Sequence, residues 1–136
     1  MKKAFLFLIV ILLCGCSVSK PIHVCSMKDN NVEWRIEYTL DDNENLSDMS
    51  QRLKINCADE SERKAYEKSV DSVFDAYLEN YGEACQVENK DDGLNIERIL
   101  TIDFSQLSDD KKEEMGYESK EDYLIAQLEF AGYQCE

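Results

Sequence analysis

Strict alternation of apolar and polar residues predicts the strands in the first half of the chain. The pattern is clearest in residues 32–40. A period of two is typical of a strand with one buried face. Residues 23–28 and 49–57 alternate in the same way, and polar clusters at 29–31 and 41–45 predict the turns between them. These segments therefore predict an antiparallel meander of three strands. The apolar positions of its middle strand are Val32, Trp34, Ile36, Tyr38 and Leu40.

A helical period replaces the alternation after residue 59. Asp59, with Glu62 three residues later, has the form of a capping box, and Gly82 is a typical helix stop. Between them, apolar and aromatic residues recur every three or four positions, which predicts one stripe along a long helix. We expect this stripe to cover the sheet. Its members are Tyr66, Val70, Val73, Phe74, Tyr77, Leu78 and Tyr81.

Two further strands are predicted on either side of an Asp-Gly turn. Residues 85–90 and 94–104 flank Asp91-Asp92-Gly93, which is a strong hairpin signal. Arg98 falls on the apolar face of the second strand, where it either ends the buried stretch or needs an acidic partner. The apolar positions of that face are Leu94, Ile96, Leu100, Ile102 and Phe104.

The C-terminal part of the chain predicts two shorter helices. Ser108 caps a short charged helix that ends near Gly116. Ser119 begins the next helix, with Asp122 at the capping-box position, and Gly132 ends it. The expected apolar stripe of this last helix is Tyr123, Leu124, Gln127, Leu128 and Ala131.

The order of the main elements is βββαββα. Helices separated from antiparallel strands in this way predict an α+β fold, in which one long and one shorter helix cover a sheet made of a three-strand meander and a hairpin. We expect residues 23–136 to form this single domain, because a chain of 136 residues has room for one core only.

The first sixteen residues have the layout of a lipoprotein signal. Lys2 and Lys3 precede ten apolar residues at positions 4–13, which are too few to cross a bilayer because a membrane helix needs about 20. An ordinary secretory signal or an uncleaved short anchor would share these features. The segment Leu13-Cys14-Gly15-Cys16, however, resembles the bacterial lipobox, whose cysteine receives diacylglycerol before the peptide bond on its amino side is cut.

We therefore expect three parts. Residues 1–15 are a signal peptide, residues 16–22 are a tether that carries lipid on Cys16, and the domain follows. Two acyl chains hold a protein stably on a membrane. The expected location is the extracytoplasmic face of the cell membrane, and the membrane is contacted through the lipid on Cys16.

The charge of the chain limits its partners. The sequence has 29 acidic and 15 basic residues, a net charge of −14, and loss of Lys2 and Lys3 with the signal makes it more negative. Such an excess repels nucleic-acid phosphates and anionic headgroups. We expect no nucleic-acid partner, and we interpret the acidity as favouring solubility.

Cysteines give the second structural expectation. Cys14 leaves with the signal and Cys16 takes the lipid, so four cysteines remain in the domain. An even number in an exported chain favours disulfides, and four cysteines allow three pairings. Chain order ranks them, because two cysteines flank the long helix and two lie at the ends of the domain. The favoured pairs are Cys57 with Cys85, and Cys25 with Cys135.

Candidate chemistry is sparse. His23 is the only histidine, and nucleotide-binding or serine-hydrolase motifs are absent from the sequence. We assign no catalytic residue and no cofactor. The best metal candidates are Asp41, Asn43 and Asn45, whose oxygens alternate as in a calcium loop. Leu46 stands where such a loop needs glycine, so a weak calcium site is the lesser alternative to a polar turn.

Several short segments together match the pattern of one family. The segments are Leu13-Cys14-Gly15-Cys16, His23-Val24-Cys25-Ser26-Met27, Gly82-Glu83-Ala84-Cys85, residues 94–104 and Ala131-Gly132-Tyr133-Gln134-Cys135. They resemble the YehR-like small lipoproteins of low-GC Gram-positive bacteria. This resemblance implies an α+β domain on a lipid tether and supplies no activity. Cys25 and Cys135 match the terminal cysteines of the family, which supports their pairing, whereas Cys57 departs from the pattern.

The functional expectation follows from the anchor and the absence of a catalytic set. We expect a membrane-anchored, non-enzymatic binding or interaction module whose partner is a protein or a small ligand. The alternative is a weak calcium or small-ligand binding protein that uses the acidic turns.

Overall fold

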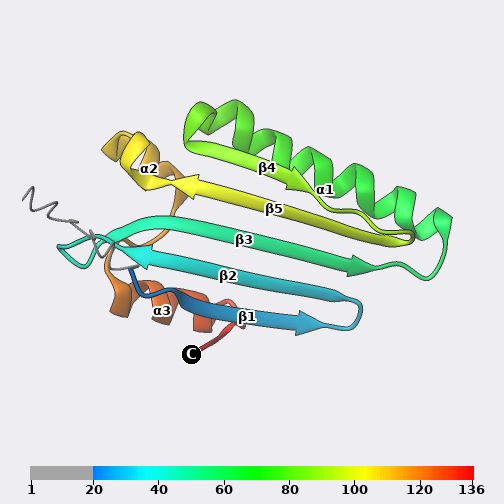
Figure 1. The fold of residues 1–136 in the computed structure, drawn as a ribbon, viewed down its shortest axis with the longest axis horizontal. Helices are drawn as coiled ribbons and strands as arrows, with labels where there is room; N and C mark the ends of the chain where they lie inside the picture. Colours follow the sequence, from blue (N-terminus) through cyan, green and yellow to red (C-terminus); the bar gives the residue numbers. More distant parts are fainter. Residues whose placement is uncertain (1–19) are drawn as a thin grey trace, which may run out of the picture.

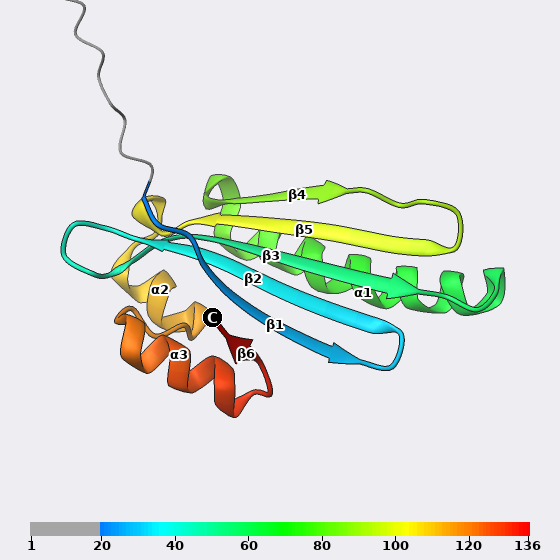
Figure 2. The ribbon, with the colours of Figure 1, turned by 60° about the horizontal axis from the view of Figure 1, so that its bottom comes forward.

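The computed structural model describes residues 20–136 as a single six-stranded antiparallel sheet with helices on one side (Figures 1 and 2). The expected signal peptide and Cys16 lie outside the described residues. The strands are ordered β4-β5-β3-β2-β1-β6 across the sheet. The α+β class and the order of the main elements are as predicted. The elements are β1 (His23–Asp29), β2 (Val32–Leu40), β3 (Leu46–Asn56), α1 (Glu60–Tyr81), β4 (Cys85–Asn89), β5 (Asn95–Asp103), α2 (Asp109–Met115), α3 (Glu121–Phe130) and β6 (Gln134–Cys135).

The predicted meander forms with the expected faces. In the ladder of β2 and β3, Tyr38 lies opposite Met49 and Trp34 lies opposite Leu53. Because side chains alternate along a strand, these pairs share one face of the sheet, and Tyr38 and Met49 are almost fully buried there. The core therefore lies between this face and the helices.

Helix α1 begins and ends where the sequence predicts. Asp59 accepts a hydrogen bond from the backbone N–H of Glu62 at 2.9 Å, and the Glu62 carboxylate accepts one from the N–H of Ala58 at 2.6 Å. Gly82 ends the helix at φ 56°, a left-handed value that favours glycine.

The buried stripe of α1 is narrower than expected. Val70 and Phe74 are buried, but Val73 is 54% exposed and Leu78 is 37% exposed. At 100° per residue these two side chains project from opposite margins of the predicted stripe, about 140° apart. A flat sheet covers only the centre of the stripe, so both margins remain in solvent.

The C-terminal segment differs most from the prediction. Helix α3 begins at Glu121 after Lys120, which makes no side-chain cap, and not at Ser119. Leu124 and Leu128 are buried, but Tyr123 is 67% exposed, so the helix packs on the core mainly through its two leucines. The chain then forms β6, a two-residue edge strand that the sequence did not predict, and this strand pairs with β1.

The structure contains the expected bond between Cys25 and Cys135, and it does not form the expected second bond. Cys25 and Cys135 lie directly opposite each other in β1 and β6. Cys57 and Cys85 are both free and buried. They lie at opposite ends of α1, whose 22 residues span about 33 Å, whereas a disulfide needs Cα atoms within about 7 Å.

The two free thiols should resist modification in the folded protein. Burial raises the pKa of Cys57 and of Cys85, so little thiolate forms at neutral pH. We expect iodoacetamide to modify both residues only after unfolding in urea without reductant. Mass mapping of the non-reduced digest should then give a linked Cys25–Cys135 peptide. A linked Cys57–Cys85 peptide would contradict the structure.

Arg98 joins α1 to the sheet. Its side chain is 2% exposed on the core face of β5 and donates from Nε to Asp71 of α1 at 3.1 Å. A second carboxylate, that of Asp91 in the β4–β5 turn, binds the Nη1 end of the same guanidinium. Asp91 also accepts from Arg63 of α1 at 3.3 Å. Of the two alternatives that the sequence left open for Arg98, the structure shows an acidic partner, supplied by both the helix and the turn.

Candidate functional site

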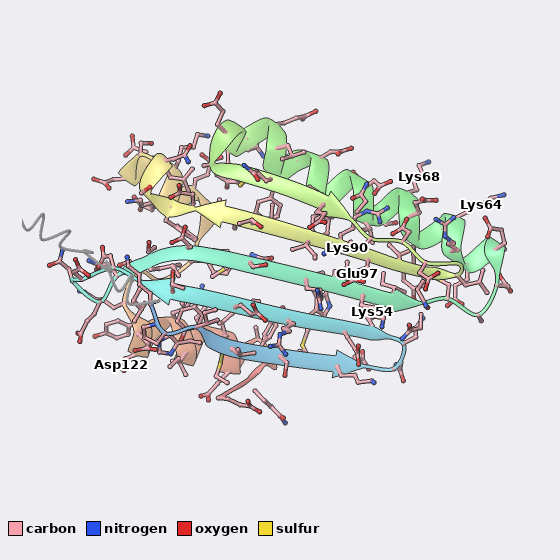
Figure 3. The ribbon with its side chains drawn as sticks, in the orientation of Figure 1. Lys54, Lys64, Lys68, Lys90, Glu97 and Asp122 are labelled. Atoms are coloured by element: carbon pink, nitrogen blue, oxygen red, sulfur yellow. A yellow bond between two sulfur atoms is a disulfide. The ribbon has the colours of Figure 1, made fainter. Side chains whose placement is uncertain are left out.

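The candidate site is the face of the sheet that none of the helices in residues 20–136 covers. Figure 1 looks onto this face, with α1 and α3 behind the strands. Side chains of Val70, Phe74, Leu124 and Leu128 join the core on the far side. The near side carries the polar positions of the strands, and Lys54 and Glu97 are visible on it in Figure 3.

One row across this face alternates in charge. The ladders place Lys28 opposite Glu33, Glu33 opposite Lys54, and Lys54 opposite Glu97. Lys28 Nζ lies 2.8 Å from Glu33 Oε1, and this hydrogen bond with the charge of Lys28 lowers the pKa of Glu33. Opposite charges on directly facing residues stabilise a sheet, so this row is sufficiently explained as a structural feature.

The adjacent row breaks the alternation. Arg35 of β2 lies directly opposite Arg52 of β3, and the row continues to Ser26 on one side and Ile99 on the other. Facing like charges destabilise a sheet. The one acidic residue of this row, Glu88 in β4, faces Ile99 and lies directly beside neither arginine. The compensating carboxylates come from neighbouring rows. Arg35 Nε lies 2.7 Å from Glu37, and Arg52 Nε lies 3.0 Å from Glu97.

Two open hollows adjoin the arginine pair. One of about 640 Å³ extends over β1, β2 and β3 and includes Lys54 and Gln134 at its margins. The other, of about 170 Å³, is bordered by Ser50 and Ile99. Arg35 and Arg52 line both. The arginine pair thus lies where the two hollows meet, on the exposed side of a rigid sheet.

The acidic turn forms a second, separate region. Asp41 Oδ1 accepts the backbone N–H groups of Asn43 at 2.8 Å and Asn45 at 2.9 Å. Hydrogen bonding to Asn45, which outweighs desolvation, lowers the pKa of Asp41. Lys120 Nζ donates to the carbonyl of Asn43 at 2.9 Å. The turn borders a hollow of about 490 Å³ that also includes Asp109.

These bonds lead to a prediction for calcium. One oxygen of Asp41 and the carbonyl of Asn43 are already engaged, and the ammonium group of Lys120 repels a cation there. In the described part of the chain, no group of three or more His, Cys, Asp or Glu residues has the geometry to hold a metal ion. We expect calcium at about 5 mM to leave the melting temperature of the protein unchanged. A ligand raises this temperature only when it binds the folded form. A rise that Asp41→Asn abolishes would establish the calcium alternative.

The other predicted residues are dispersed. His23 lies on the core side of β1, stacks on Tyr38 with ring centroids 5.0 Å apart, and has Nδ1 2.9 Å from Glu121. The two cysteines of the disulfide lie at the opposite margin of the sheet from β4. Within residues 20–136, none of these residues forms a hydrogen bond or an ion pair with Arg35 or Arg52.

Sequence reasoning missed Arg35 and Arg52 as a pair. Both occupy polar positions of predicted strands, so their face could be predicted. Their register could not, because it depends on the length of the 41–45 turn and on the irregularity between Thr39 and Leu40. A shift of this pairing by one residue would turn one of the two arginine side chains to the other face of the sheet, so that they would no longer face each other.

Comparison with known proteins bears on the fold. No protein-family model and no curated protein matches the chain. The NMR structure of the E. coli YehR protein is similar at 16% identity, with a TM-score of 0.55 over 85% of this chain and 90% of that chain. The chain has a YehR-like fold. The NMR structure of a protein from Streptococcus pneumoniae TIGR4 is also similar, at 14% identity and a TM-score of 0.53, over 100% of this chain and 94% of that chain.

The similarity to these two structures confirms the α+β architecture that the resemblance implied. At 16% and 14% identity it supports the fold alone. Membership of a Gram-positive lipoprotein family stays a prediction. Among residues 20–136, no helix is long and apolar enough to cross a membrane.

Proposed function

We propose that this protein is a non-enzymatic binding module, held at the extracytoplasmic face of the cell membrane by lipid on Cys16, and that it binds its partner on the uncovered sheet face. The observation that carries the proposal is the asymmetry of the sheet. Helices cover one face, while the other presents two hollows that meet at Arg35 and Arg52.

The disulfide supports export. Bonds of this kind form and persist in oxidising compartments, and the Cys25–Cys135 pair fastens the edge strand β6 to the sheet. The lipobox at Leu13-Cys14-Gly15-Cys16 supplies the anchor in this proposal. With residues 16–22 extended, the tether reaches about 24 Å at most, so the domain would lie close to the bilayer.

The uncovered face favours binding over catalysis. Several of its ionisable side chains form ion pairs, among them Lys28–Glu33 and Arg52–Glu97. The only histidine, His23, lies on the other face against Glu121. A sheet face with fixed charges and two adjoining hollows suits the recognition of a polar ligand.

Lipidation can be tested by metabolic labelling. Cells that express the protein should incorporate labelled palmitate into it, and Cys16→Ala should abolish both the label and the membrane partition of the mature chain. The matched control is Cys14→Ala, which removes a cysteine of the signal and should leave labelling intact. Membrane partition that survives Cys16→Ala would contradict the anchor.

The binding face can be tested with a membrane-impermeant maleimide. Thr101→Cys places a thiol on the uncovered face, since Thr101 lies opposite Ser50, and Lys68→Cys places one on α1. We expect both to react in intact cells, with Thr101→Cys reacting more slowly in cells than in the purified protein because a partner covers it. Equal rates for Thr101→Cys in the two settings would contradict occupancy, and no reaction of either variant in cells would contradict the location.

A further inference from the structure

The terminal nitrogens of Arg35 and Arg52 have no bonding partner in the part of the chain that the structure describes. Each guanidinium carries five N–H donors, and each contacts its glutamate through Nε. Within residues 20–136, neither side chain donates a hydrogen bond from Nη1 or Nη2. The two side chains are 50% and 48% exposed. Both bidentate ends therefore remain available at the surface.

The register places the two arginine side chains next to each other. Directly opposed residues of an antiparallel pair have Cα atoms about 5 Å apart, and Arg35 and Arg52 project from the same face. Because directly facing like charges destabilise a sheet, an anion that contacts both guanidinium groups would be stabilising at this position. Glu37 and Glu97 bind at the Nε side from the rows on either side of the arginine row, so the terminal nitrogens of both guanidinium groups have no partner among residues 20–136.

The free donors suit an oxyanion. Guanidinium groups bind carboxylate and phosphate oxygens through paired N–H groups, and the two non-bridging oxygens of a phosphate diester can each face one guanidinium. The net charge of the surrounding side chains indicates the charge of the bound anion. Arg35 and Arg52 balance Glu37 and Glu97, and Lys54, which forms no ion pair within the described residues, leaves a single positive charge.

We infer that Arg35 and Arg52 form a binding site for a phosphodiester group. This group is a tetrahedral monoanion with a substituent on each side, and a hollow adjoins the arginine pair on each side to receive the two substituents. The hydroxyl of Ser50 borders the smaller hollow and can donate to an ester or phosphoryl oxygen. The inference rests on the proposed function in taking the uncovered face as the binding surface, and it adds the chemical class of the ligand.

The test is a titration of the full-length protein in maltoside micelles, which contain no phosphate. Diethyl phosphate is added while NMR follows the Nε–Hε resonances of Arg35 and Arg52, with acetate at equal ionic strength as the comparison. We expect saturable shifts with diethyl phosphate that are larger than those with acetate. Arg35→Gln and Arg52→Gln should each raise the dissociation constant about tenfold, the effect of losing one charge-assisted interaction.

Lys68→Gln is the matched control. It removes one positive charge from α1, on the other side of the sheet from the arginine pair, and should leave the dissociation constant unchanged (Figure 3). Equal weakening by Lys68→Gln, or acetate binding as tight as that of diethyl phosphate, would overturn the site. So would the absence of any shift, both with diethyl phosphate and with phosphatidylglycerol in the micelles.

The micelle composition distinguishes the sources of the ligand. Shifts of the same resonances with phosphatidylglycerol, and not with diacylglycerol, support the site and identify a lipid headgroup as the ligand. Shifts with diethyl phosphate alone support the site and identify a soluble or polymeric diester. A failed titration leaves the palmitate and maleimide results unaffected, so the ligand class and the proposed function fail separately.

Discussion

Joint replacement of Cys25 and Cys135 by alanine should lower the free energy of unfolding by about 5 kcal/mol. The bond joins residues 110 positions apart, and the loop-entropy model assigns about that much to a loop of this length. The loss should be largest near the C-terminus, because β6 has only two residues with which to hold the sheet edge. Urea unfolding at neutral pH measures the change, and amide exchange should show α3 opening first.

The control for this change is joint replacement of Cys57 and Cys85 by alanine. These residues form no cross-link within residues 20–136, so the variant should lose only the packing of two buried sulfur atoms, about 1 kcal/mol for each. Reductant should destabilise the wild type and the control variant, and should not affect the variant without Cys25 and Cys135. A wild-type unfolding midpoint that is insensitive to reductant would contradict the importance of this bond.

Arg98→Met should lower the free energy of unfolding by about 3 kcal/mol. The change keeps an apolar stem in the core but leaves Asp71 and Asp91 without the cation that joins them. Removing one partner of a buried ion pair costs about 3–5 kcal/mol, and the lower figure applies because both carboxylates retain some contact with water. Urea unfolding measures the loss. Arg35→Met, which breaks an exposed pair, should cost less than about 1 kcal/mol.

The same variant should change the response to acid. Burial alone would raise the pKa of Asp91, but the hydrogen bonds from the Glu97 N–H and from Arg98 outweigh it, so the pKa is lowered. A lowered pKa in the folded state contributes stability that is present above the unfolded value near 4 and is lost as the pH falls further. We expect Arg98→Met to lose less stability than the wild type between pH 5 and about pH 3. Parallel losses would contradict this role of Arg98.

The strands and the long helix were predictable because their signals are local. Alternation in residues 32–40 and the capping box at Asp59 each depend on neighbours within a few positions, and a helix or strand responds to such neighbours directly. The apolar face of β5 was predictable for the same reason, and an acidic partner for Arg98 was one of the two alternatives that the sequence offered. The identity of that partner was not, because Asp71 lies 27 residues away on another element.

Cysteine pairing shows where local reasoning ends. Chain order ranked Cys57 with Cys85 because both flank α1, but a straight helix keeps its two ends apart, and only the packed fold determines which cysteines meet. Tyr123 shows the same limit, since helical spacing fits two faces of α3 and contact with the sheet selects the one with Leu124 and Leu128.

The amino-acid sequence by itself determined the element types, the two faces of each strand and the α+β class, because periodicity within a segment decides which side chains share a side. The tertiary structure alone decided three things: that β6 closes the sheet through Cys135, that α1 and α3 cover the same face, and that Arg35 stands against Arg52. Each of these depends on the register between segments, and register arises from turn lengths and packing across the whole domain.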